Sequence, residues 1–139
     1  MPHLKSRNLF ISHSWSYGDD YKRLVALLDD APNFQYKNYS VPKNDPVHNA
    51  PNIEALSRAI GDQMVFCDVV VIAAGKYATF SKWIQREIQI AKGYTTPKPI
   101  VAVRPWGSGQ VSSVVSNAAD RLVGWRTDSI VAAIRELDP

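Results

Sequence analysis

The sequence has little that would cross-link the chain, bind a metal or anchor it in a membrane. A single cysteine, Cys67, excludes an internal disulfide, and three isolated histidines lack the spacing of zinc ligands. The longest apolar run, 69–74, is far shorter than the roughly 18 residues of a membrane span, and residues 1–8 lack the apolar core of a signal peptide. We therefore expect a cytoplasmic protein with no metal and no membrane contact.

A large excess of charge of either sign is missing as well. Lysine and arginine number 16 against 13 acidic residues, a formal charge of +3, and no basic cluster is interleaved with aromatic residues. Such a pattern gives no support to a nucleic-acid partner. With 45% hydrophobic and 21% charged residues, the composition is that of a globular protein, and 139 residues suit one domain over 1–139.

Strand patterns alternate with helix patterns along the chain. Strands are predicted at 8–12, 34–39, 68–75, 99–104 and 121–125, and helices at 20–31, 53–64, 80–94 and 111–119, with a last helix capped by Thr127 or Asp128. This alternation predicts an α/β fold: a five-stranded parallel sheet in the flavodoxin-like order 2-1-3-4-5, with helices on both faces. Ligands of such sheets bind beyond the carboxyl ends of the strands. The loops 12–18, 75–81 and 104–109 are therefore the predicted ligand edge.

One acid interrupts the apolar side of the helix at 80–94. At about 100° per residue from Trp83, Glu87 lies near 40°, among the apolar positions, whereas Gln85, Arg86, Gln89 and Lys92 lie on the opposite arc. A buried carboxylate must be paired, hydrogen-bonded or protonated. Glu87 is therefore either a functional acid or half of a structural ion pair with Lys82, Arg86 or Arg104.

Polar residues end the first strand at the predicted ligand edge. Ser12 and Ser14 share one side if the strand continues, and their hydroxyls are candidates for contacts to a ribose or phosphate, or for loop caps. His13 faces away from both, which makes a serine–histidine nucleophile a poor interpretation. Phe10 is either a core residue or part of the site.

Three further candidates lie just before and within the helix that carries Glu87. Tyr77 and Ser81 lie in the segment 75–81 that leads into the helix, whose first amides favour an anionic diphosphate, although both residues also suit a turn and a cap. Trp83 is one turn before Glu87 and is a core anchor beside the site, a stacking wall, or both. Cys67, beside Phe66, is predicted to be a buried, inert thiol.

Two segments resemble a known family. The segment 8–14 (NLFISHS) resembles the first-strand signature of TIR domains, and 75–88 (GKYATFSKWIQREI) resembles their segment in which a Tyr and a Ser precede a Trp and a Glu four residues further on. Together with the long proline-bearing loop at 40–51, the pattern is most similar to the bacterial TIR-like proteins of Thoeris antiphage defence, over nearly the whole chain. The resemblance implies the three-layer TIR-like fold.

The resemblance also implies an activity. TIR-like enzymes of this kind cleave the nicotinamide–ribose bond of NAD, and the family's essential glutamate falls on Glu87. NAD would be the substrate, with no cofactor, and the product a cyclic ADP-ribose isomer that signals to a separate effector protein. The substrate-binding residues predicted from their places at the ligand edge and beside Glu87 are Phe10, Ser12, His13, Ser14, Tyr77, Ser81 and Trp83.

Two other functions remain open at this point. One is a TIR-type interaction module that forms homo-oligomers through the 40–51 loop, with Glu87 in a structural role. The other is an enzyme like the nucleoside deoxyribosyltransferases, which also place a glutamate at the ribose.

Overall fold

The computed structural model describes residues 6–12, 20–32, 34–39, 53–74, 82–104 and 111–138. Strands in these ranges are β1 (Ser6–Ile11), β2 (Gln35–Asn38), β3 (Val69–Ala73), β4 (Ile100–Val103) and β5 (Arg121–Val123). Helices are α1 (Asp20–Asp29), α2 (Ile53–Met64), α3 (Lys82–Gly93), α4 (Ser113–Ala118) and α5 (Thr127–Leu137). Each predicted strand or helix is present, with ends that differ by at most two residues.

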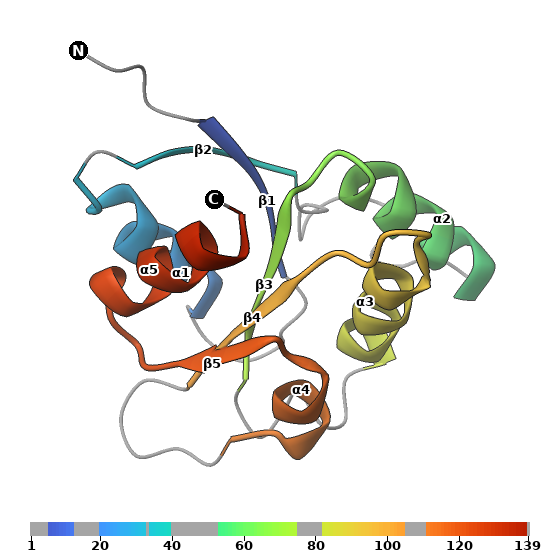
Figure 1. Cartoon of the computed structure of the whole chain (residues 1–139). Helices are drawn as coiled ribbons and strands as arrows, with labels where there is room; N and C mark the ends of the chain where they lie inside the picture. Colours follow the sequence, from blue (N-terminus) through green and yellow to red (C-terminus); the bar gives the residue numbers. More distant parts are fainter. Residues whose placement is uncertain are drawn as a thin grey trace.

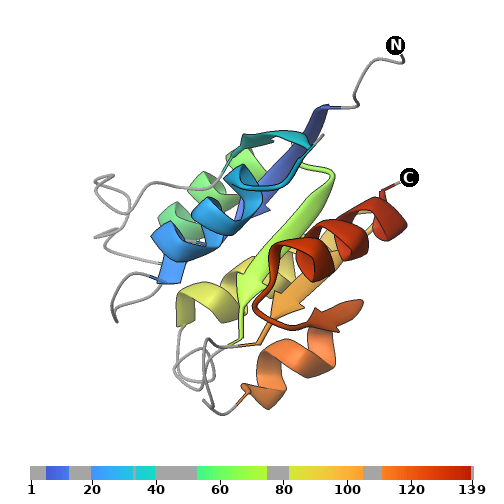
Figure 2. The same cartoon turned by 90° about the vertical axis from the view of Figure 1, so that its left-hand side faces the viewer.

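The strands form one parallel sheet in the order β2-β1-β3-β4-β5, which confirms the predicted fold class and topology. Helices α2, α3 and α4 lie on one face of the sheet, and α1 and α5 on the other (Figure 1). Turned by 90°, the molecule shows α1 and α5 side by side against the sheet (Figure 2). The β-branched strand β3 is central and the more polar β2 is at an edge, as their patterns predict.

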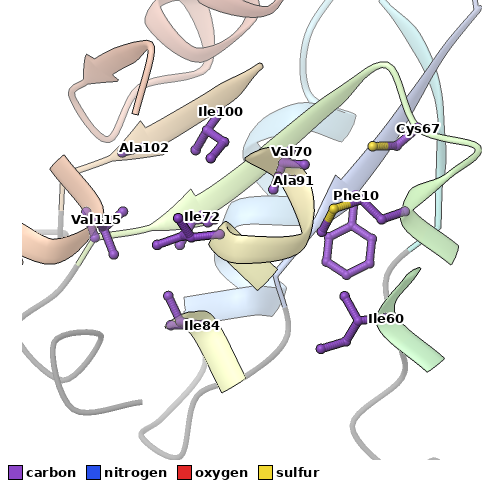
Figure 3. Packing of buried hydrophobic residues seen from close by; sticks show 13 residues of the cluster. Phe10, Ile60, Cys67, Val70, Ile72, Ile84, Ala91, Ile100, Ala102 and Val115 are labelled. Atoms are coloured by element: carbon purple, nitrogen blue, oxygen red, sulfur yellow. The ribbon is translucent and has the colours of Figure 1, made fainter. Parts of the chain in front are cut away.

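The core has two halves because side chains alternate along each strand. Residues facing α2, α3 and α4 include Phe10, Val70, Ile72, Ile100 and Ala102, and Figure 3 shows them packed with Ile60 and Ile84 of the helices. Residues facing α1 and α5 include Leu9, Ile11, Val69, Val71, Val101 and Val103. The sheet is thus covered on both faces, as expected for parallel strands.

Two aspartates join neighbouring strands at their starts. Asp68, just before β3, accepts the backbone N–H of Asn8 at 2.9 Å and donates its own N–H to the Asn8 carbonyl at 2.6 Å. Asp120, just before β5, makes the same pair of bonds with Ile100, both at 2.8 Å. Each carboxylate therefore extends the backbone pairing of two strands by one side-chain hydrogen bond and fixes their register.

The predicted cap of the last helix is wrong. Arg126 occupies the N-cap position of α5 and makes no side-chain capping bond. The Thr127 hydroxyl instead donates to the Leu27 carbonyl in α1 at 2.7 Å, and Asp128 accepts the N–H of the adjacent Ser129. Thr127 is already the first residue of α5, one position after the N-cap, so its hydroxyl does not take the place from which a side chain accepts the free N–H groups of the first turn.

Candidate active site at the carboxyl edge of the sheet

Ser12 is held in place at the carboxyl end of β1. Its backbone N–H donates to the Val71 carbonyl of β3 at 2.8 Å, so the pairing of the two central strands continues through this residue. Its side chain is on the same face as that of Phe10, two residues earlier, because strand side chains alternate. That face is covered by α2 and α3. Ser12 therefore points from the sheet towards the helix that carries Glu87.

Glu87 is buried in α3, as its position in the apolar stripe predicts. Only 1% of the residue is exposed, and its helix neighbours Ile84, Ile88 and Ala91 belong to the core. On the opposite arc, Gln89 and Lys92 are exposed, and Gln85 and Arg86 are half-buried. The amphipathic arrangement read from the sequence is therefore present, with a carboxylate on the inner face.

A hydrogen bond joins these two buried residues. The Ser12 hydroxyl donates to Glu87 Oε1 over 2.7 Å, and Ser12 is 7% exposed. This length is typical of a hydroxyl that donates to a carboxylate. Of the residues considered for a structural ion pair with Glu87, Arg86 is half-buried and Arg104 exposed, and the Lys82 side chain lies outside the described part of the chain.

The arrangement suits the stabilisation of positive charge. A carboxylate away from bulk water acts on nearby charge more strongly than an exposed one, because little solvent screens it. The hydroxyl of Ser12 offers the ionised form a donor that the surrounding aliphatic side chains lack. Within the described ranges, histidine, cysteine, aspartate and glutamate side chains form no group that could hold a metal ion. Among the described residues, the group at this edge that can stabilise a positive charge is the Glu87 carboxylate, oriented by the bond from Ser12.

Phe10 is fully buried and packs in the core half that also contains Ile60, Ile72 and Ile84 (Figure 3). The core interpretation of Phe10 is therefore confirmed, and a contact between this residue and a substrate stays a prediction. Its ring anchors β1 two residues before Ser12.

The remaining predicted site residues fall outside what the structure describes. His13, Ser14, Tyr77 and Ser81 lie outside the described residues, as does the 40–51 loop. Trp83 belongs to α3, but its side chain is not described. Their predicted roles in substrate binding and self-association stay predictions.

Ser112 is a residue of this edge that the sequence interpretation did not single out. It is 1% exposed, and its hydroxyl accepts the Val115 N–H as the N-cap of α4. Its backbone N–H donates to the Ala74 carbonyl at the end of β3 at 2.8 Å. A serine immediately before a helical segment is a recognisable capping signal, so its cap was predictable, whereas its bond to β3 was not.

Cys67 is buried, as predicted, with 2% of the residue exposed. Burial raises the pKa of its thiol from 9.0 to about 12, against the opposing effect of the nearby Lys98 charge. Such a thiol stays protonated at neutral pH and is a poor nucleophile.

Two grooves lie elsewhere on the described surface. One, of about 620 Å³, is lined by residues 30–32 after α1, by Arg126 just before α5 and by residues of α5 that include Arg135. The other, of about 500 Å³, lies between the ends of α2 and α3 beside Tyr94. Neither is lined by Ser12 or Glu87.

No helix in the described ranges is long and apolar enough to span a membrane.

The chain was compared with protein families and with curated proteins. The family model for the TIR-like domain of the Thoeris protein ThsB matches residues 10–110. A search of the curated proteins finds no match. The matched range begins within β1, ends after β4 and contains both Ser12 and Glu87. The match covers well over half of the chain, so this protein belongs to the Thoeris ThsB TIR-like domain family, which has its role in antiphage defence.

Proposed function

We propose that this protein is an enzyme that cleaves the nicotinamide–ribose bond of NAD, with Glu87 as the catalytic carboxylate. The observation that carries the proposal is the 1% exposed acid at the carboxyl edge of the sheet, hydrogen-bonded to Ser12 at the end of β1. Membership of the Thoeris TIR-like family supports it. This edge is also where parallel α/β sheets bind their ligands.

The bond that breaks joins C1′ of the ribose to the pyridinium nitrogen. Its electron pair leaves with nicotinamide, which becomes neutral, and positive charge grows on C1′ and the ring oxygen. A carboxylate beside this oxocarbenium-like centre stabilises the transition state more than the ground state. Because NAD already carries an activated leaving group, position and electrostatics are all that the protein needs to supply.

The acceptor decides the product. A lone pair of the acceptor forms the new bond to C1′, and the acceptor then loses a proton. Water gives ADP-ribose, whereas a hydroxyl or an adenine nitrogen of the same molecule gives a cyclic isomer. The low exposure of Ser12 and Glu87 favours the cyclic product, because a site that excludes water favours an internal acceptor. In this proposal the cyclic nucleotide signals to a separate effector protein.

The decisive experiment measures nicotinamide release from NAD by chromatography for the wild-type chain, Glu87→Gln and Glu136→Gln. The control makes the same chemical change at a carboxylate that is 59% exposed, on α5 and thus on the other face of the sheet. Dilute, concentrated and crowded samples are compared because assembly shifts stability and activity by mass action. Circular dichroism confirms that each variant is folded.

The wild type and Glu136→Gln are expected to release nicotinamide, and Glu87→Gln to lose at least about 100-fold in rate, as for other groups that stabilise a transition-state charge. Equal rates for Glu87→Gln and wild type would overturn the role of Glu87. Release of bases from deoxynucleosides in place of NAD cleavage would indicate a deoxyribosyltransferase. Assembly without turnover in any sample would indicate an interaction module.

A further inference from the structure

We propose that Ser12 is a positioning residue for the Glu87 carboxylate and does not bind the substrate through its hydroxyl. This inference rests on the proposed function and assigns Ser12 a role different from the substrate contact predicted from the sequence. The observation behind it is the 2.7 Å bond from the Ser12 hydroxyl to Glu87 Oε1, within a buried pair.

The backbone from which the Ser12 hydroxyl extends is held in place by the sheet. The Ser12 backbone is tied to the Val71 carbonyl of the central strand β3 at 2.8 Å. Two residues earlier, Phe10 is fully buried in the core and holds the same face of β1 against α2 and α3. Since a serine side chain has a single heavy-atom torsion, its oxygen can reach few positions from a backbone held in this way. The sheet thus determines where the donor lies.

A donor in this position acts directly on the Glu87 carboxylate. A glutamate side chain has three torsions, and those of Glu87 extend from a helix face made of Ile84, Ile88 and Ala91. Aliphatic neighbours limit the space available to the carboxylate but offer no directional contact. A bond from Ser12 to Oε1 sets the orientation of the carboxylate plane and stabilises its ionised form. Both effects are needed for a group that must face a growing positive charge.

A positioning role and a substrate-binding role predict different kinetics. Loss of a positioning bond slows the chemical step and leaves substrate affinity almost unchanged, so kcat falls and KM is almost unchanged. Loss of a substrate contact made equally in the ground and transition states raises KM and leaves kcat. Threonine and valine form a matched pair at position 12, because they have nearly the same shape and differ in the hydroxyl.

The kinetic test compares kcat and KM for NAD cleavage in wild type, Ser12→Ala, Ser12→Thr and Ser12→Val. We expect kcat to fall about ten- to a hundredfold in the alanine and valine variants, the range for one hydrogen bond to a charged group, with KM within about threefold. Ser12→Thr is expected to retain most of the wild-type kcat. A raised KM with an unchanged kcat, or equal rates for the threonine and valine variants, would overturn the proposal.

A second measurement does not depend on activity. The carboxyl carbons of ¹³C-labelled glutamates are followed by NMR as the pH is changed, and the Glu87 signal is assigned by its absence in Glu87→Gln. Ser12→Val lacks the hydroxyl that donates to the ionised carboxylate, so the titration midpoint of this signal is expected to move to higher pH. In Ser12→Thr, which keeps a hydroxyl, the midpoint is expected to stay at its wild-type value. An unchanged midpoint in Ser12→Val would overturn the proposal. If the wild type releases no nicotinamide, the proposed function fails, and this comparison still decides whether Ser12 holds the carboxylate.

Discussion

The hydroxyl of Ser12 and the carboxylate of Glu87 are 75 residues apart in the sequence and 2.7 Å apart in the fold. One belongs to the end of the first strand and the other to the inner face of the third helix. The bond therefore links the two segments through which the sequence resembles TIR domains, and it makes the position of the acid depend on the packing of α3 against β1.

The first prediction concerns the energy of this bond. A double-mutant cycle with Ser12→Ala and Glu87→Met, each measured by urea unfolding, is expected to give a coupling free energy of about 1.5 to 3 kcal/mol, the range for a hydrogen bond to a charged group. Methionine keeps the length of the side chain and removes the acceptor. The same cycle between Ser12 and the exposed Glu136 should give less than about 0.5 kcal/mol. Equal couplings in the two cycles would contradict the assigned bond.

The second prediction concerns the aspartates that join strand starts. Asp120→Ala removes the acceptor of the Ile100 N–H and is expected to lower the free energy of unfolding by about 1 to 3 kcal/mol, because a partly buried donor loses its partner. Asp68→Ala should behave in the same way at Asn8. The matched control is Asp30→Ala, an exposed aspartate after α1, with an expected change within about 0.5 kcal/mol. Denaturant melts of the three variants check the ranking.

The third prediction concerns Arg7, which is 8% exposed at the start of β1. Its Nε and Nη2 atoms both donate to the Asp138 carbonyl after α5, at 3.1 and 3.0 Å. A lysine cannot make this two-armed contact, so Arg7→Lys is expected to cost about 1 to 3 kcal/mol. Arg121→Lys, at the exposed pair with Glu136, should cost clearly less than Arg7→Lys, because solvent screens an exposed ion pair. If both variants unfold at the same urea concentration as the wild type, the contact between Arg7 and the Asp138 carbonyl is refuted.

The fourth prediction concerns pH and Cys67. In the folded chain burial raises the pKa of this thiol to about 12, whereas the unfolded thiol ionises at its ordinary value of 9.0. The unfolded state therefore loses its proton first, so the contribution of the protonated thiol to stability is complete below pH 9 and declines between pH 9 and 12. The slope is about 1.4 kcal/mol per pH unit. Subtracting the urea stability of Cys67→Ala at each pH isolates this contribution, and a constant difference from pH 8 to 11 would disprove it.

Much of the fold was predictable because its signals are local. The run of β-branched residues at 69–72 identifies a central strand, and the alternation in 34–39 identifies an edge strand, through periodicity alone. The burial of Glu87 followed from the same kind of reasoning, since a rotation of about 100° per residue places it on the inner face of α3. Local periodicity therefore located the acid of the candidate site.

Contacts between distant segments were not predictable from such signals. Thr127 has the sequence of a helix cap, yet its hydroxyl bonds to Leu27, 100 residues earlier. From the sequence alone Arg7 is read as a surface charge, because its partner Asp138 lies at the other end of the described chain. Ser12 was assigned to the ligand edge, but its bond to Glu87 requires knowledge of how α3 packs on β1. Each of these partners is selected by tertiary structure, for which one sequence carries no periodic signal.

The position of α5 late in the sequence has a consequence for synthesis on the ribosome. Helix α5 supplies Ile130, Val131, Ala133 and Ile134 to the core half that also contains Leu9, Ile11 and Leu24, from the first 30 residues. The part of this apolar face that α5 covers therefore stays open until α5 has left the exit tunnel of the ribosome. Transiently exposed apolar surface of this kind makes an incompletely folded chain prone to aggregate, so this half of the core carries the greater risk during elongation.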